Sequence, residues 1–284
     1  MDKNLLKLYI FFLIFFFILI KIFPNLFSNI NNDISLIKSN NIMLFEKKEN
    51  NEVNIYENRG NVILMFDDGL KTQYTIAFDY MNKKKLRGSI SVITDSVGEP
   101  DYINKSELYE MYNNNWDILN HTSNHIILNK SNINKQKKEI EKADKWLFNN
   151  NFHSQYNVLV YPEGRHNTDT YNIMKKLNYV SGRGIEDGFN ENIPNDLYDI
   201  KIKNVITNVE PEEVFKWIDY AKENKLTLIL LFHKLENNID ETNMKYNINN
   251  FYKIIDYINK KRKYVNVITY SDWINFIVYN KNNI

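Results

Sequence analysis

The sequence predicts an α/β fold in which parallel strands form a sheet or a barrel, and two observations carry this prediction. From Asn61 onward, short apolar runs alternate with longer stretches of helical periodicity, as they do in folds built from strand–helix units. Polar clusters directly follow several of the strand-like runs, which is where active sites gather in such folds. A length of 284 residues suits one domain and a short additional segment.

The runs expected to form strands are short, and most are apolar. The first run is apolar throughout, and the sixth is the most apolar of the set. In the second, Ile90 and Val92 alternate with serines. The expected strands are Val62–Phe66, Ser89–Thr94, Trp116–Leu119, Val158–Tyr161, Tyr179–Arg183, Leu226–Phe232 and Val265–Thr269.

The stretches between these strands have the apolar spacing of helices. Ser106 is expected to begin one of them, and Pro211 precedes another, as proline often does at the first turn of a helix. The expected helices are Tyr74–Lys85, Lys105–Asn114, Asn132–Asn150, Thr168–Leu177, Glu212–Asn224, Ile248–Lys261 and a last one from Asp272. Since the heavy use of Asn and Lys looks like a compositional bias, we give Asn runs no structural weight.

An apolar segment at the N-terminus is expected to export the rest of the chain. Residues 8–20 contain no charged side chain and lie between Lys7 and Lys21; with flanking apolar residues the span approaches the roughly 20 residues needed to cross a bilayer. Because Lys3 and Lys7 precede it, the N-terminus is expected in the cytoplasm. We predict an uncleaved single-pass anchor over residues 1–24, with a cleaved signal peptide and secretion as the alternative.

The rest of the chain is expected to divide into a polar stalk or linker, residues 25–57, and a catalytic domain, residues 58–284. With 36 basic and 35 acidic side chains, the chain has no overall charge that would attract nucleic acid. The absence of cysteine excludes disulfides, zinc–thiolate sites and thiol nucleophiles. Any metal must therefore be held by histidine and carboxylate side chains.

Paired carboxylates directly follow the first expected strand. Asp67 and Asp68 precede Gly69, which permits a tight backbone path. Adjacent side chains in a loop can face different ways, so one carboxylate can bind a cation while the other serves as a base. Taken alone, the same tripeptide is also common in turns without catalytic function.

Two of the five histidines, His121 and His125, lie four residues apart after the third expected strand. On a helical turn this spacing places both rings on one face, within reach of a single ion. The alternative is a pair of histidines on a helix face without a ligand. A carboxylate from a neighbouring strand end would complete a His–His–Asp set with open positions for water and substrate.

Two further polar signals follow later strands. His233 follows the most apolar strand and has the pKa range of a general acid near neutral pH. In the loop Tyr161–Gly164, backbone N–H groups can face a substrate oxygen. The alternatives are a core histidine and a plain turn. His153 and His166 lie in polar loop sequence, and we expect both to be solvated.

Together these segments resemble the polysaccharide deacetylase family (the NodB-homology domain, carbohydrate esterase family 4). The third segment is similar to the YPxG form of the family's third motif, which occurs in poly-N-acetylglucosamine deacetylases. The matching segments come in the family's order and are Phe66–Gly69, His121–His125, Tyr161–Gly164, the strand before His233, and Val267–Trp273.

The resemblance implies a distorted (β/α) barrel and metal-dependent removal of acetyl groups from N-acetylated sugars. By position, it implies that Asp67 is the general base and His233 the general acid. The implied metal is Zn²⁺, with Co²⁺, Ni²⁺ or Mn²⁺ as alternatives, and its ligands are Asp68, His121 and His125. The implied substrate and oxyanion contacts, which include the backbone N–H of Glu163, come from Tyr161, Pro162, Glu163 and Gly164.

The chain departs from the family pattern at positions that orient the base and the acid. Many members carry arginine two places before the proline of the third motif, where this chain has Val160. Arg165 and Arg183 are the candidates to replace that arginine. The family's fourth motif has no clear counterpart, and Asp187 is the expected partner of His233.

The sequence therefore predicts a membrane-anchored enzyme that removes N-acetyl groups from GlcNAc units of an extracellular or cell-wall polysaccharide, either poly-N-acetylglucosamine or peptidoglycan. One alternative is an esterase that removes O-acetyl groups from xylan or another glycan. The other is a catalytically silent glycan-binding protein on the same fold. The expected partners are the polysaccharide and, through residues 1–24, the membrane; nucleic acid is not expected.

Overall fold

In the computed structural model, which describes residues 59–238 and 244–282, strands and helices alternate along the chain. The strands of the main sheet are β1 (Asn61–Phe66), β2 (Ser89–Val92), β3 (Asp117–Asn120), β4 (Asn157–Val160), β5 (Tyr179–Asp187), β6 (Ile200–Asn204), β7 (Thr227–Phe232) and β10 (Asn266–Ile268). The helices are η1 (Gln73–Phe78), α3 (Asp79–Lys83), η2 (Thr94–Ser96), α4 (Lys105–Asn113), η3 (Leu128–Lys130), α5 (Ile133–Asn149), η4 (Pro162–Gly164), α6 (Thr168–Lys176), α7 (Pro211–Asn224), α8 (Ile248–Lys261) and α9 (Tyr270–Asn282).

A barrel of parallel strands closes through β1. One edge of β1 pairs with β7 along its whole length, from Asn61 opposite Thr227 to Phe66 opposite Phe232. The other edge pairs first with β10 and then, from Met65 onward, with β2. Strands β2 to β7 complete the ring in chain order. The expected parallel α/β barrel is therefore confirmed.

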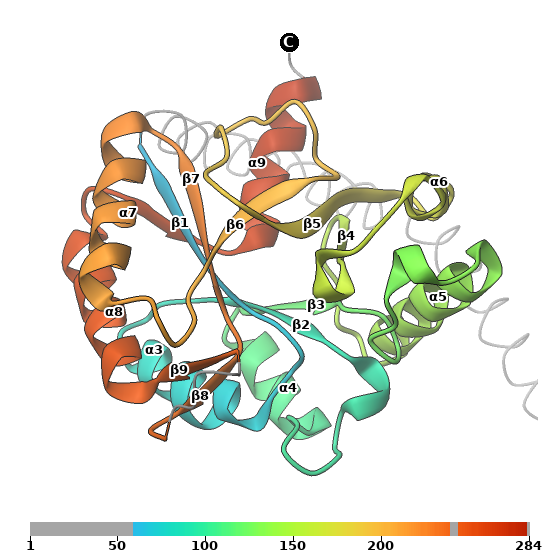
Figure 1. Cartoon of the computed structure of the whole chain (residues 1–284), viewed down its shortest axis with the longest axis horizontal. Helices are drawn as coiled ribbons and strands as arrows, with labels where there is room; N and C mark the ends of the chain where they lie inside the picture. Colours follow the sequence, from blue (N-terminus) through green and yellow to red (C-terminus); the bar gives the residue numbers. More distant parts are fainter. Residues whose placement is uncertain (1–58, 239–243, 283–284) are drawn as a thin grey trace, which may run out of the picture. The chain divides into compact units, whose positions relative to one another are not determined.

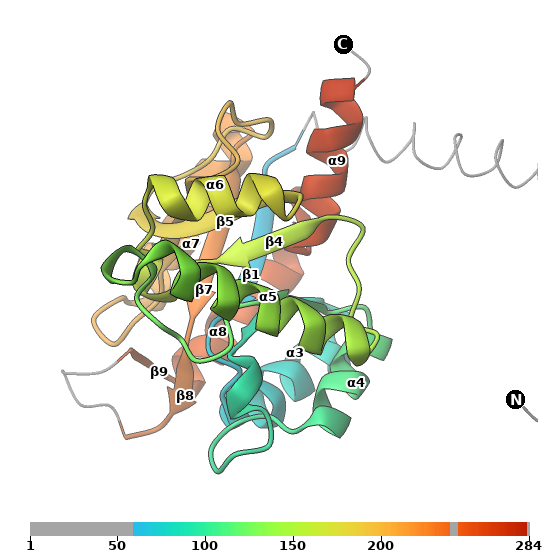
Figure 2. The ribbon, with the colours of Figure 1, turned by 90° about the vertical axis from the view of Figure 1, so that its right-hand side faces the viewer.

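Burial explains why β1 and β7 are so apolar. Every residue of both strands is buried, because one face of a closed parallel barrel meets the interior and the other meets covering helices. Figure 1 shows α7 and α8 along one side of the barrel and α5 and α6 along the opposite side. In the view of Figure 2, β4 lies between α6 above and α5 below.

The barrel is irregular between β3 and β6. Asn120 lies opposite Leu159 where β3 pairs with β4, and the ladders from β4 to β5 and from β5 to β6 each contain a register shift. Side chains add a connection on this side, since the amide of Asn120 donates a hydrogen bond to the hydroxyl of Tyr179 at 2.7 Å. The distortion therefore lies next to the loop that follows β3.

Single asparagines, outside the Asn runs, begin several of the helices. An Asn side chain accepts the backbone N–H groups that the first helical turn leaves open. Asn104, rather than Ser106, caps α4 in this way. The capping residues of α4, α5, α6 and α8 are Asn104, Asn132, Asn167 and Asn247.

Some elements lie outside the expected set. β6 does so although Ile200 and Ile202 alternate with lysines, as in a half-buried strand. β8 (Lys234–Glu236) and β9 (Lys245–Asn247) form a separate pair of three residues each, too short for a periodic pattern. The last helix begins at Tyr270 instead of Asp272.

The expected anchor, residues 1–24, and the expected linker, residues 25–57, lie outside the described residues. Within the part of the chain that the structure describes, no helix has both the length and the apolar character needed to cross a bilayer. The domain boundary at residue 58 stays a prediction.

Asp117, at the start of β3, makes the stability of the fold depend on pH. Burial, with a contribution from the Asp272 carboxylate, raises the pKa of Asp117 to about 6, although the Ser271 backbone N–H and the Ser89 hydroxyl donate hydrogen bonds to it. In the folded protein Asp117 thus keeps a proton that it loses at lower pH in the unfolded chain, where its pKa is 3.8. The stabilisation is complete below about pH 4 and is lost as the pH rises through about 6.

We expect Asp117→Asn to be nearly neutral at pH 4 and, above pH 6, to raise the free energy of unfolding by up to about 3 kcal/mol, since one pKa unit corresponds to about 1.4 kcal/mol. Urea denaturation between pH 4 and pH 7 measures the effect. Parallel pH profiles for the wild type and the variant would show that Asp117 does not titrate in this range.

Candidate active site

The carboxyl ends of the parallel strands meet at one edge of the barrel, where polar residues line a cleft of about 650 Å³. Parallel strands place the loops that follow them side by side, so residues far apart in the sequence become neighbours. The structure brings all the residues predicted as base, acid or metal ligand to this cleft: Asp67, Asp68, His121, His125 and His233.

Asp68, His121 and His125 form a group whose ligand atoms lie within 4.8 Å of one another. The Asp68 Oδ1 is 3.5 Å from the Nε2 of each histidine. The Nδ1 of His121 lies 2.8 Å from the carbonyl oxygen of Val160; because that oxygen only accepts, Nδ1 carries the hydrogen and Nε2 keeps a lone pair for a metal. Two imidazoles and one carboxylate suit a divalent cation with open coordination positions.

The electrostatics of this group favour ligation. Burial, together with the neighbouring His121 ring, lowers the pKa of His125, so its imidazole stays neutral over a wider pH range. Burial alone would raise the pKa of Asp68, but the adjacent His121 imidazole lowers that pKa overall. A neutral imidazole and an ionised carboxylate are the forms that bind metals.

The loop His121–His125 is not the helical turn that the spacing suggested. It has no regular secondary structure, and Thr122 and His125 have positive φ angles of 64° and 55°. The Thr122 N–H donates to the Asn120 Oδ1 at 2.7 Å, which forms a turn of the Asx type. The two rings still converge, with centroids 4.8 Å apart. The two histidines are therefore close together as expected, although the backbone between them is not helical.

Asp67 is buried and held by an ion pair. Both carboxylate oxygens accept hydrogen bonds from the Nη2 of Arg183, and Oδ1 also accepts one from the Ser91 hydroxyl at 2.8 Å. Burial raises the pKa of Asp67, but the charge of Arg183, with smaller contributions from His121 and His233, brings that pKa well below its ordinary value. Asp67 is therefore an oriented, ionised carboxylate.

Arg183, not Arg165, reaches the expected base. Arg183 lies on β5 directly opposite Val160 of β4, so the guanidinium enters from the neighbouring strand at the level where the family's arginine is missing. It is fully buried, whereas Arg165 is exposed and lines the cleft.

Gln73 was not among the expected site residues. Its side-chain amide donates hydrogen bonds to the backbone carbonyls of Asp67 and His233, the latter at 3.1 Å, and its Oε1 accepts the Leu70 N–H at 3.1 Å. Gln73 is fully buried and ties together the loops that follow β1 and β7. Its sequence signal is slight, because Gln73 lies among other polar residues, Lys71, Thr72 and Thr75.

The expected pairing of Asp187 with His233 is wrong. Asp187 ends β5, its side chain is 73% exposed, and it forms an ion pair with Lys203. Burial lowers the pKa of His233, and its Nδ1 is buried without a hydrogen-bond partner among the described residues. The register shift in the β5–β6 ladder carries Asp187 toward Lys203 on β6.

The loop Tyr161–Gly164 contributes less side-chain surface to the cleft than expected. Tyr161 is fully buried, and its hydroxyl donates to the Tyr198 carbonyl at 2.9 Å. A Cβ on the neighbouring Gly182 would lie 1.8 Å from that hydroxyl, so the close approach requires glycine. Pro162 is also buried, and Glu163, at φ 52°, lines the cleft.

His166 is not the solvated residue that we expected, whereas His153 is exposed. The Nδ1 of His166 donates to the Gly164 carbonyl at 3.1 Å, and its Nε2 accepts from the Tyr171 hydroxyl at 2.8 Å. Its ring also stacks on that of Tyr171. His166 therefore stabilises the loop after β4.

Comparisons with known proteins agree with the motifs. Residues 55–182 match the family model described as polysaccharide deacetylase, a range that includes Asp67, Asp68, His121 and His125 and ends before Arg183. A Bacillus subtilis protein provisionally named polysaccharide deacetylase YxkH is 33% identical over 128 residues, 45% of this chain and 45% of that protein. The poly-β-1,6-N-acetyl-D-glucosamine N-deacetylase of Staphylococcus aureus is 32% identical over 154 residues, 49% of this chain and 52% of its own.

The chain thus spans about half the length of the curated relatives it matches. Among solved structures, the Streptococcus pyogenes deacetylase PplD in complex with acetate has a TM-score of 0.51 at 24% identity, covering 54% of this chain and 68% of its own. The Xyl-CE4 domain of a multidomain xylanase from the hindgut metagenome of Trinervitermes trinervoides has a TM-score of 0.55 at 14% identity. The match covers 80% of this chain and 93% of that domain. These two structures share the fold.

The ion pair of Asp67 and Arg183 makes a prediction about stability. Arg183→Met leaves a buried carboxylate without its cation, and we expect the free energy of unfolding at pH 7 to fall by about 3–5 kcal/mol. Urea denaturation measures the loss. Arg165→Met is the matched control, with an expected change within about 0.5 kcal/mol because Arg165 is exposed.

Adding Asp67→Asn to Arg183→Met should recover part of the lost stability, since no buried charge then lacks a partner. An Arg183→Met protein as stable as the wild type would contradict an ionised Asp67 in the folded protein.

Proposed function

We propose that this chain, whose residues 55–182 match the polysaccharide deacetylase family model, is a metal-dependent hydrolase that removes N-acetyl groups from GlcNAc units of a polysaccharide. The observation that carries the proposal is the grouping of Asp68, His121 and His125 beside the buried, ion-paired Asp67 in one cleft. The Staphylococcus aureus relative, named for poly-β-1,6-N-acetyl-D-glucosamine, supports that polymer as the first candidate substrate, ahead of peptidoglycan.

Asp68, His121 and His125 would hold the cation. Their nitrogen and oxygen donors suit Zn²⁺ best, with Co²⁺, Ni²⁺ and Mn²⁺ as alternatives. When bound, the cation supplies Lewis acidity that polarises the acetyl carbonyl group. The hydrogen bond from His121 to the Val160 carbonyl supports this role because it presets the ring for ligation.

Asp67 would act as the general base. Its lowered pKa keeps the carboxylate ionised at neutral pH, so it is able to accept a proton from the water that attacks the acetyl carbon. Arg183 and Ser91 bind the carboxylate oxygens and hold them in one orientation. The base therefore needs no rearrangement before the reaction.

His233 would act as the general acid. It follows β7, the strand next to β1, and lines the same cleft as Asp67. Water adds to the acetyl carbon, the bond from that carbon to nitrogen breaks, and the nitrogen takes a proton from His233. The products are acetate and a free amine. The backbone N–H of Glu163 would donate to the oxygen on which negative charge develops.

The reaction would take place outside the cytoplasm. The support is the uncharged apolar block of residues 8–20, with Lys3 and Lys7 before it, which favours an outward-facing catalytic domain. Residues 1–24 would then anchor the enzyme in the cell membrane, and signal cleavage would instead release it.

Acetate release by the full chain tests the proposal. In detergent and loaded with Zn²⁺, the protein is expected to deacetylate GlcNAc oligomers, to lose this activity in a chelator and to recover it when Zn²⁺ is restored. Acetylated xylan serves as the O-acetyl substrate in the same assay. Faster release from xylan would indicate the esterase, and release from neither substrate would indicate a silent glycan-binding protein.

Two substitutions separate the base from the metal site. Asp67→Asn should lower kcat by about 10²–10⁴-fold with the Zn²⁺ content unchanged, whereas His125→Ala should lose Zn²⁺. Asp187→Asn and His153→Ala are the matched controls, because both residues are exposed. Undiminished acetate release by Asp67→Asn or His125→Ala would refute these roles.

A further inference from the structure

The loop His121–His125 carries two of the three proposed metal ligands without any regular secondary structure of its own. Its positive φ angles at Thr122 and His125 are conformations that residues other than glycine adopt at a cost. Contacts from outside the loop must therefore hold it, and the side chains that do so come mainly from α5.

Glu139 of α5 binds the middle of the loop. Its Oε2 accepts hydrogen bonds from the Ser123 hydroxyl and from the Asn124 backbone N–H, the latter at 2.9 Å. Ser123 is fully buried, so loss of this acceptor would leave a buried hydroxyl unsatisfied. The two bonds hold the chain immediately before His125.

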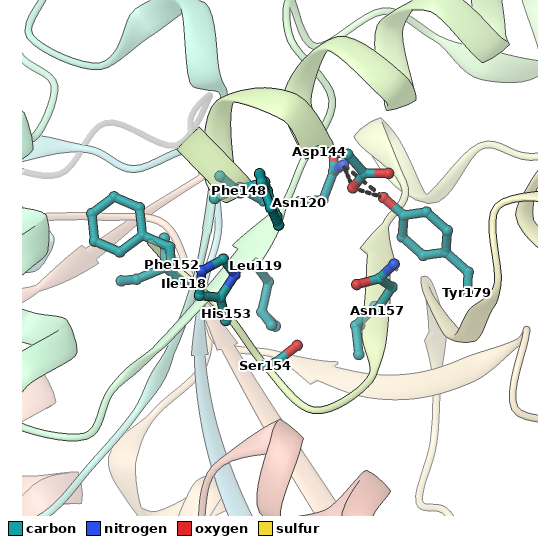
Figure 3. A pocket seen from close by; sticks show the side chains of 12 residues that line it. Ile118, Leu119, Asn120, Asp144, Phe148, Phe152, His153, Ser154, Asn157 and Tyr179 are labelled. Carbon is teal, nitrogen blue, oxygen red and sulfur yellow. Dashed lines mark hydrogen bonds between the residues drawn. The ribbon is translucent and has the colours of Figure 1, made fainter. Parts of the chain in front are cut away.

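Asp144 of α5 acts at the other end of the loop through Asn120. Figure 3 shows its carboxylate against the Asn120 amide and the Tyr179 hydroxyl, both of which donate to its Oδ1. Asn120 is 2% exposed, and its own Oδ1 accepts the Thr122 N–H. The orientation of the Asn120 amide thus sets the turn that contains His121.

The opposite side of the loop is held by η2. The backbone N–H groups of Thr94 and Asp95 donate to the carbonyls of Thr122 and Ser123, at 3.3 Å and 3.0 Å. The Asp95 side chain forms an ion pair with Lys142 of α5. Since η2 and α5 are connected in this way, they hold the loop from two sides.

We propose that Glu139 and Asp144 are positioning residues that set the metal affinity of the site. They hold His121 and His125 so that both rings reach Asp68, at 3.5 Å from each Nε2. The inference rests on the proposed function in taking these three residues as the ligands. Side chains that orient metal ligands typically contribute about 10–100-fold in metal affinity.

Zn²⁺ binding by the metal-free full chain tests the inference, by competition with a chromophoric chelator. Glu139→Ala and Asp144→Ala are expected to raise the Kd for Zn²⁺ by about 10–100-fold and to weaken the visible absorption bands of bound Co²⁺. Glu139→Gln and Asp144→Asn keep an acceptor oxygen at each position and should bind Zn²⁺ almost as tightly as the wild type.

Glu141→Ala is the matched control. Glu141 lies on α5 between the two positioning residues and pairs with Lys137, so its removal should leave the Kd unchanged. Ser123→Ala removes the hydroxyl that donates to Glu139 and leaves α5 unchanged. This variant should weaken Zn²⁺ binding on its own. Added to Glu139→Ala, it should weaken binding no further, because the two groups act as a unit.

Circular dichroism of each metal-free variant shows whether it is folded, and Ser123→Ala carries the test if an alanine variant on α5 does not fold. Wild-type Zn²⁺ affinity in Glu139→Ala, Asp144→Ala and Ser123→Ala would overturn the inference and leave the proposed function standing. Equal losses in the Gln and Ala variants of Glu139 would also overturn it, since charge rather than position would then be responsible. A wild-type chain that binds no Zn²⁺ would instead overturn the proposed metal-dependent function, and this inference with it.

Discussion

The pairing of β1 with β7 along the whole of β1 is the constraint on which the site depends. The ladder continues past the strands themselves, since the Asp67 N–H donates to the Phe232 carbonyl at 3.1 Å. Both strands therefore end at the same level of the barrel. Gln73 then binds the carbonyls of Asp67 and His233, which fixes the backbone of the proposed base and the proposed acid to one rigid edge before any ligand arrives.

Burial of the Asp67 carboxylate imposes a second constraint, because a buried charge needs both a counter-charge and hydrogen-bond donors. Ser91 of β2 and Arg183 of β5 supply them. Arg183 pairs in register with Val160, and the Val160 carbonyl accepts the Nδ1 hydrogen of His121. A single register, between β4 and β5, therefore orients the proposed base and one proposed metal ligand together.

Local patterns were enough to predict most strands and to gather the central site residues, because each depends on an apolar run followed at once by a polar residue. Long-range register is absent from such patterns. It decides that Arg183 rather than Arg165 reaches the base, that Asp187 meets a lysine, and that Gln73 bridges two loops. The segment His121–His125 lies between these cases: its spacing predicted the convergence of the rings, while its backbone, set by side chains of α5, was predicted wrongly.

Thr122 shows why the conformation of this loop and metal binding belong to one equilibrium. A β-branched residue at φ 64° is uncommon, and the left-handed conformation costs about 1–2 kcal/mol. Hydrogen bonds offset that strain: the Thr122 N–H donates to Asn120 and its carbonyl accepts from Thr94. They persist only while Asn120 stays in place, and a relaxed backbone would change the direction of His125 relative to Asp68. The hydrogen bonds that offset the strain at Thr122 are thus the same contacts that align the proposed metal ligands. A change that breaks these hydrogen bonds would also move the ligands apart.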